Sequence, residues 1–399
     1  MTTISIPPAL ARRRDYAGPA LFSYGFRPFF LAGATWAAVG VLLWLFQYLG
    51  AIALPTAMAP LDWHIHEMLY GYVPAIVAGF LLTAIPNWTG RLPVNGWPLA
   101  ALASLWLAGR LATLFSLHIG GWTAAVVDLA FLACFIGVAL REIVAGRNWR
   151  NLRLLAMLGI LFAGNAVFHF EAVEYGSAVD GIRIGIAAAL MLIMLVGGRI
   201  VPSFTHNWIG RQNPGRLPQS FSRYDAASLA VAGTALVFWV LAPEQAFVGA
   251  VLIFAGVLQF IRLTRWAGDR VLADRLVLVL HIGYLFVPLG FLLVGASILW
   301  PYEFPASAGL HAWTVGAIGT MTLAVMTRAS LGHTGQPLAA SMATQAIYAF
   351  ILVAALARIL APWDTTMVLL YLAAFAWVAA FACFVLIYGP LLLLRPPRT

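Results

Sequence analysis

Lysine is absent from this chain of 399 residues, and charged residues of either sign are few. Only 9% of the residues are charged, whereas 62% are apolar and the mean hydropathy is +0.91. A soluble domain has about 25% charged and about 45–50% apolar residues. No soluble fold of this length can hide so much apolar surface, so we expect lipid to surround most of the chain.

Cysteine is also scarce, and its placement excludes two kinds of site. Cys134 and Cys383 both lie in apolar runs, so neither a disulfide framework nor a thiolate metal site is expected. The sequence has no P-loop, no Rossmann glycine motif and no H-E-x-x-H zinc motif. The 23 basic residues are all arginine and are dispersed among loops. Membrane topology explains them better than a nucleic-acid-binding patch does.

Long apolar runs predict an all-α integral membrane protein with about twelve transmembrane helices. A helix needs about 20 apolar residues to cross the bilayer, whereas a barrel would show alternating segments of about ten residues. No cleavable signal peptide is expected, because Arg12–Arg14 is followed by loop-like sequence. The runs fall at 29–49, 67–86, 97–117, 121–140, 154–173, 183–203, 226–242, 245–263, 274–298, 308–327, 341–361 and 367–392.

Arginine is distributed unevenly between alternate loops, which predicts the orientation. With the N-terminus in the cytoplasm, only Arg110, Arg183 and Arg358 lie at outward helix ends. Positive residues favour the cytoplasmic side of a membrane, so both termini are expected there. The expected parts are a cytoplasmic segment 1–28, a single transmembrane domain 29–392 and a cytoplasmic tail 393–399.

Three segments align without gaps and suggest an internal repeat. They begin at His66, Ile186 and His311, are offset by 120 and then 125 residues, and end in NWTGR, NWIGR and GHTGQ. Chance similarity between apolar segments is the alternative explanation. A true repeat would give three pseudo-repeats of four helices with parallel-type pseudo-symmetry, at 29–140, 154–263 and 274–392.

Eight histidines are the main candidates for chemistry, because an ionisable side chain at membrane depth is costly and usually functional. His66 and His311 are the favoured pair, since both lie 24 residues before the glycine of a Thr-Gly dipeptide. Two imidazoles at one depth are able to hold one metal, as in a bis-histidine haem. The alternative is hydrogen bonding to loops or lipid headgroups. Further candidates for haem or a second metal are His64, His169, His281 and His333.

Polar residues near these histidines are candidates for supporting roles. Glu67 is either a hydrogen-bond acceptor for an imidazole or an acid favoured at a helix N-terminus. Arg199 and Arg328 have the fork geometry that recognises carboxylates such as haem propionates. Tyr284, in the segment LHIGY, belongs to the same set. Headgroup contact is again the alternative.

The segments WHIHEMLYGY, VGGRIVPSFT, LHIGY and HAWTVGAIGTMTLAVMTRASLGHTG, with the opening SYGFRPFF, resemble the NnrS family. These bacterial membrane proteins are associated with nitric oxide and denitrification. The resemblance covers nearly the whole chain and implies the bacterial inner membrane, haem b and, as a second metal, copper. Gln336 stands where the family is expected to have arginine. The family's motif histidines correspond to His64, His66, His281, His311 and His333.

The expected architecture is also distantly similar to subunit I of haem-copper oxidases. In those proteins histidines on the second and tenth helices hold a low-spin haem. Here the seventh helix has no His-His pair, and the sixth has no H-x-x-x-Y. A complete oxidase-type binuclear site is therefore not expected.

Two functions remain open from the sequence. The first is a haem-binding protein, with copper as a further metal, that binds nitric oxide or another diatomic ligand in denitrification or the response to nitrosative stress. As a nitric oxide-related oxidoreductase it would need a respiratory-chain electron donor. The second is a transporter or metal-handling protein without redox chemistry, which scattered methionine and intramembrane charge also suit. A scaffold for a respiratory complex is a third, less specific interpretation.

Overall fold

The computed structural model describes residues 16–212 and 215–395, and this part of the chain is helical without β-strands. Within it, twelve helices are long and apolar enough to cross a membrane, which confirms the all-α class and the predicted number of spans. The protein is therefore a multi-pass membrane protein in contact with lipid. Arg12–Arg14 of the expected segment 1–28 and Arg398 of the tail 393–399 lie outside the described residues.

The chain divides into two compact units. The first comprises Met1–Ile182 and Tyr388–Thr399, and the second comprises Arg183–Ile387. Two helices cross from one unit to the other along the chain, namely α9 (Asp180–Gln212) and α16 (Val368–Leu393). The division into three four-helix blocks stays a prediction.

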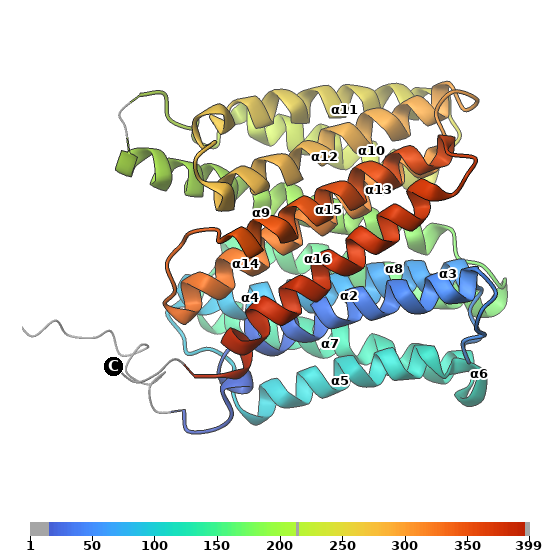
Figure 1. The fold of residues 1–399 in the computed structure, drawn as a ribbon, viewed down its shortest axis with the longest axis horizontal. Coiled ribbons are helices and arrows are strands. Elements are labelled where there is room, and N and C mark those ends of the chain that lie inside the picture. The colour runs from blue at the N-terminus through green and yellow to red at the C-terminus, as the bar shows by residue number, and fades with distance from the viewer. Residues whose placement is uncertain (1–15, 213–214, 396–399) are drawn as a thin grey trace, which may run out of the picture. The chain divides into compact units, whose positions relative to one another are not determined.

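The first unit is built on five spans. Its elements are η1 (Ala20–Ser23), α2 (Phe26–Tyr48), α3 (Pro60–His66), η2 (Glu67–Tyr72), α4 (Val73–Thr89), α5 (Trp97–Leu114), α6 (Ser116–Ile119), α7 (Gly121–Ala145), η3 (Trp149–Asn151) and α8 (Leu152–Glu174). Helix α2 packs on α4, α4 packs on α7, and α7 also packs on α5 and α8 (Figure 1). Elements α3, η2 and α4 form one continuous span with a π-helical turn at η2.

The second unit contains most of α9 and of α16. Its other elements are α10 (Arg223–Leu241), α11 (Ala246–Thr264), η4 (Gly268–Arg270), α12 (Arg275–Leu299), α13 (Ala306–His311), η5 (Ala312–Gly319), α14 (Thr320–Thr334), α15 (Met342–Leu360) and η6 (Ala361–Trp363). Helix α11 packs between α10 and α12, and α12 packs along α13, η5 and α14 (Figure 1). Elements α13, η5 and α14 form one continuous span, in which η5 is a π-helix between two α-helices.

A constant spacing of 245 residues relates the interrupted spans of the two units. In each, an α-helix begins at or next to a proline and ends at a histidine, a π-helix follows, and the span ends at a glycine in the left-handed conformation. The glycine is required there because other residues adopt a positive φ only with strain. The corresponding pairs are Pro60 and Pro305, His66 and His311, Gly71 and Gly316, and Gly90 and Gly335.

The third copy of the predicted repeat has a different local structure. Residues 186–211 belong to the uninterrupted helix α9, and Gly210 lies inside its last turn. The sequence motif is therefore shared by three segments, but the π-helix and the glycine cap are shared by two.

The second span begins at Pro60, seven residues before the apolar run predicted at 67–86. The reason is that its first two turns contain the polar residues Asp62, His66 and Glu67, which a hydropathy pattern places outside the membrane. All three side chains are buried within the protein. Buried polar partners thus replace lipid around this part of the helix.

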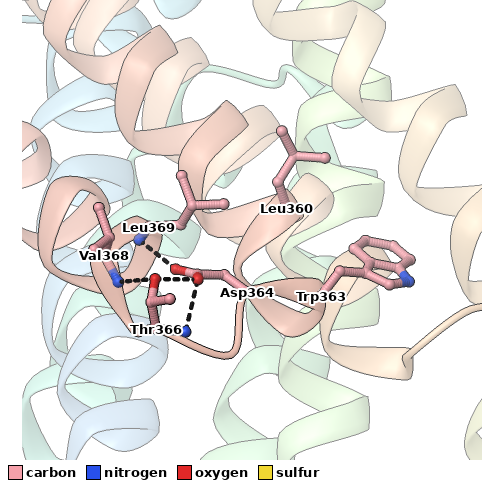
Figure 2. A pocket seen from close by; sticks show the side chains of 6 residues that line it. All are labelled: Leu360, Trp363, Asp364, Thr366, Val368 and Leu369. Atoms are coloured by element: carbon pink, nitrogen blue, oxygen red, sulfur yellow. Dashed lines mark hydrogen bonds between the residues drawn. The ribbon is translucent and has the colours of Figure 1, made fainter.

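Asp364 holds the turn between α15 and α16. Figure 2 shows its carboxylate accepting hydrogen bonds from the backbone amides of Thr366, at 2.8 Å, and Leu369, at 2.7 Å. The surface pocket in Figure 2, of about 550 Å³, is lined by Leu360, Trp363, Asp364, Thr366, Val368 and Leu369. These hydrogen bonds engage both carboxylate oxygens in the turn itself.

We expect the turn to lose protection from hydrogen exchange on acidification. The hydrogen bonds from Thr366 and Leu369 lower the pKa of the Asp364 carboxyl. A lowered folded-state pKa gives stability that is present above the ordinary pKa and is lost as pH falls through the folded-state value. Protection factors for 364–369 should therefore drop as the pH falls below the ordinary aspartate pKa of about 3.9. Asp364→Asn should show the low values already at neutral pH, and unchanged protection in that variant would contradict the assignment.

Candidate metal centre

Helices of the first unit bring five ionisable side chains together in the interior of the bundle. The span of α3 and η2 supplies His66 and Glu67, α5 supplies Arg110, α7 supplies Asp128 and α8 supplies His169. Their exposed fractions are all between 0% and 3%. Charges buried in a membrane interior are costly unless they are paired or bind an ion. The arrangement therefore needs an explanation beyond packing.

Two imidazole nitrogens and one carboxylate oxygen converge at the centre of this cluster. The Nε2 atom of His66 lies 3.2 Å from Nε2 of His169 and 3.3 Å from Oδ2 of Asp128. The third side of the triangle, from His169 Nε2 to the same oxygen, is 3.1 Å. Ligands about 2.0–2.1 Å from a transition-metal ion are about 2.8–3.0 Å apart in octahedral geometry and about 3.3–3.4 Å apart in tetrahedral geometry. The triangle has the size of one face of such a coordination sphere.

Neighbouring groups fix the orientation of two of the three candidate ligands, His66 and Asp128. The Nδ1 atom of His66 lies 3.0 Å from a Glu67 oxygen. This carboxylate is placed to accept a hydrogen bond from Nδ1, which favours the tautomer with a lone pair on Nε2, the nitrogen that faces the cluster. Arg110 donates to the other Glu67 oxygen at 2.7 Å and to Oδ1 of Asp128, which leaves Oδ2 directed at the imidazoles. Asn165 donates to that Oδ2 at 2.7 Å.

Glu67 is the most connected member of the cluster. Besides His66 and Arg110, its carboxylate accepts hydrogen bonds from Trp36 at 2.6 Å and from the Thr113 hydroxyl at 2.8 Å. Four donors on one buried carboxylate stabilise its charged form. Glu67 is therefore a fixed negative charge that orients its neighbours.

The carboxylates of the cluster outnumber its guanidinium groups by one. Glu67 and Asp128 are two carboxylates, whereas Arg110 is the one guanidinium that pairs with them. With both imidazoles neutral, the group carries one net negative charge. A protonated imidazole or a bound metal ion compensates this charge, and the converging nitrogens suit an ion.

The cluster lies near one end of the spans that contain it. His66 follows Pro60 by six residues, and Asp128 follows Gly121 by seven. At 1.5 Å per residue these are depths of roughly 9–11 Å from the helix ends. Trp122, at the start of α7, is 49% exposed, as is typical of the aromatic belt at a membrane surface. The predicted orientation makes this the outer face.

The π-helix brings the backbone close to the cluster. A Cβ at Gly71 would lie 2.2 Å from the Nη1 atom of Arg110 and 2.9 Å from a Glu67 oxygen. The carbonyl of Gly71 accepts a hydrogen bond of 2.8 Å from Trp106 on α5. Glycine is required here by close approach, and π-turns often occur at functional sites.

His64 and His66 have different partners, because side chains two residues apart on a helix point roughly 200° away from each other. The ring of His64 stacks on Trp44, with 4.1 Å between the ring centroids. Only His66 of this pair reaches the cluster. His169, which the sequence offers as a further candidate for haem or a second metal, lies beside His66.

The remaining predicted histidines lie in the second unit. His311 ends α13, where its Nδ1 atom is 2.6 Å from the carbonyl oxygen of Ser307. His281 is buried in α12 with Nε2 2.8 Å from the Thr205 hydroxyl, and His333 is half-buried in the last turn of α14. Because the favoured pair belongs to two different units, a haem shared between its members stays a prediction.

Two of the predicted supporting residues of the second unit, Arg328 and Tyr284, have described contacts with residues other than these histidines. Arg328 stacks over Phe204 at 4.1 Å from the ring centroid. The buried Tyr284 donates to Gln259 at 2.7 Å and accepts from Arg262 at 2.9 Å. Arg199 is exposed. Propionate binding by either arginine stays a prediction.

The sequence pattern alone does not select Arg110, Asp128 or Asn165. In the arginine count Arg110 is only a residue at an outward helix end. A usable signal exists nevertheless, because Asp128 interrupts the apolar run GWTAAVVDLAFLACF. An acid within a span is a functional candidate by default, and its partner is expected on a neighbouring helix.

A family model described as NnrS protein matches residues 20–396 of the chain. The match includes every member of the cluster and both π-helices. Comparison with curated proteins and with solved structures finds no match.

We expect Gly71→Ala to disrupt the cluster and Gly137→Ala to leave it intact. The added methyl at Gly71 meets Arg110 and Glu67, and overpacking of this kind typically costs about 1–3 kcal/mol. At Gly137, in α7, a Cβ meets nothing within 4 Å, so alanine should stabilise the helix by up to about 1 kcal/mol. Thermal unfolding in detergent, followed by tryptophan fluorescence, measures both. Equal midpoints for the two variants would contradict the close contact at Gly71.

Proposed function

The chain belongs to the NnrS family, and from this premise we propose that it holds a metal ion at His66, Asp128 and His169 and acts on nitric oxide in the bacterial inner membrane. Family membership suggests a nitric oxide-related membrane protein. The observation that carries the metal assignment is the triangle of ligand atoms with sides of 3.1–3.3 Å. Nitric oxide or another small diatomic molecule is the ligand, and a respiratory-chain electron donor is the partner if turnover is redox.

The ligand set favours a first-row transition metal. Imidazole suits zinc, copper and iron, whereas a site for magnesium or calcium would be built from oxygen atoms alone. A bound ion supplies a Lewis acid and, for copper or iron, a redox centre. The protein's own contribution is orientation, because Glu67 holds the tautomer of His66 and Arg110 holds one oxygen of Asp128.

Haem b is the second cofactor of the proposal, with His311 as a ligand. The contact between its Nδ1 atom and the Ser307 carbonyl, at 2.6 Å, favours the tautomer in which Nε2 carries the lone pair. A metal-ligating histidine commonly donates its other ring N–H in this way. Copper remains an alternative occupant of the first-unit cluster.

Metal analysis of the purified full-length protein tests the cluster. We expect about one equivalent of a transition metal beyond haem iron. Asp128→Asn and His169→Gln should lower the metal content at least tenfold, because each removes a direct ligand. His118→Gln, an exposed histidine of the same unit, is the control. Retention of metal in both cluster variants would contradict the assignment, and ready exchange with copper flux into liposomes would favour the transporter alternative.

Absorption spectroscopy tests the haem. Protein from haem-replete cells should show a Soret band, and His311→Ala should reduce it strongly, because an axial ligand is lost. His206→Ala, at an exposed position of α9, should leave the band unchanged. A colourless wild-type preparation would rule out haem b.

A further inference from the structure

The geometry of the cluster points to a non-haem site: we infer that His66, Asp128 and His169 occupy one face of a divalent ion, and that its other positions are open to a small uncharged ligand such as nitric oxide. This inference rests on the proposed metal binding and goes further in naming the coordination of the ion and in placing the diatomic ligand on that ion. It also separates His66 from any haem.

A porphyrin does not fit on the nitrogen of His66 that faces the cluster. This Nε2 atom has the side chains of Asn165 and His169 at 3.2 Å and of Asp128 at 3.3 Å. The other ring nitrogen is 3.0 Å from Glu67. A haem iron on either nitrogen would require these buried side chains to leave, whereas a single ion fits among three of them.

The ligand set consists of two histidines and one carboxylate, of which a single oxygen is available to bind the ion. Arg110 binds Oδ1 of Asp128, so only Oδ2 faces the imidazoles and the carboxylate acts as a monodentate ligand. The three ligands come from three different helices, α3, α7 and α8, and their atoms form a nearly equilateral triangle. Two-histidine, one-carboxylate sets on one face typically bind ferrous iron and leave up to three positions for external ligands.

We call His66, Asp128 and His169 the triad. The surroundings of the triad select for a small, uncharged ligand. His66 is fully buried, and the rings of Phe168 and Tyr70 lie 5.1 Å and 5.7 Å from its own ring centre. A hydrated or charged substrate would have to lose its water in this aromatic environment. A diatomic gas partitions into lipid and needs little space, so it suits a site within the spans, roughly 9–11 Å from the helix ends.

Anaerobic reconstitution of the full-length protein with ferrous iron tests the inference. Purified protein is treated with a chelator, loaded with Fe(II) and exposed to nitric oxide. Total iron minus haem iron, measured by the pyridine haemochrome, should give about one non-haem iron per chain. Electron paramagnetic resonance should then show a non-haem iron–nitrosyl signal.

Variants assign the signal to the triad. His66→Gln, Asp128→Asn and His169→Gln should each lower Fe(II) affinity at least tenfold and remove the nitrosyl signal. The Soret absorbance per chain should stay unchanged in His66→Gln. His118→Gln should behave as wild type. Loss of the Soret band with retention of non-haem iron in His66→Gln would overturn the inference in favour of a haem on this histidine.

Two outcomes separate this inference from the proposed function. If zinc or copper binds and the triad variants abolish that binding, but Fe(II) gives no nitrosyl signal, the inference fails and the metal site stands. If wild type binds none of these metals, both fail. Size-exclusion profiles and unfolding midpoints identify a variant that does not fold. The remaining two triad variants then decide the outcome.

Discussion

The ion network of Glu67, Arg110 and Asp128 is the interaction on which the interior of the first unit depends. It joins η2, α5 and α7 through a single guanidinium that contacts both carboxylates. Removing one member would leave an uncompensated charge in a medium that solvates charge poorly. The same network orients the triad, because Arg110 fixes one oxygen of Asp128 and Glu67 fixes one nitrogen of His66. The same three side chains therefore pair the buried charges and orient two of the candidate ligands.

The second unit forms a π-helical span without such charges. At the spacing of 245 residues, the positions of Glu67, Arg110 and Asp128 correspond to Ala312, Ala355 and Ala373. All three alanines are buried, and the π-helix with its preceding histidine is still formed. A π-helical span thus folds with apolar neighbours. The charges of the first unit add cost without being required by this local fold, which supports a functional reason for their presence.

Much of the fold follows from the sequence because lipid imposes a simple rule. A span must be long, apolar and helical, so twelve runs predict twelve helices. The rule fails where polar residues are buried against protein, and for that reason the start of the second span at Pro60 is displaced from the predicted run. Equivalence of His66 and His311 is also readable from the sequence, since both precede a Thr-Gly helix end. Hydropathy does not reveal the π-helices that follow them.

By itself the sequence determined the membrane class, the number of spans, the candidate histidines and the family. Only the tertiary structure decided which of these histidines meet. His66, Asp128 and His169 come from three helices, and the distance between them along the chain carries no information about their distance in space. Helix packing sets the rotation of each helix about its axis and so selects the side chains that face one another. Helix packing thus places His66 in a buried, charged cluster. The corresponding histidine of the second unit, His311, instead contacts the carbonyl oxygen of Ser307.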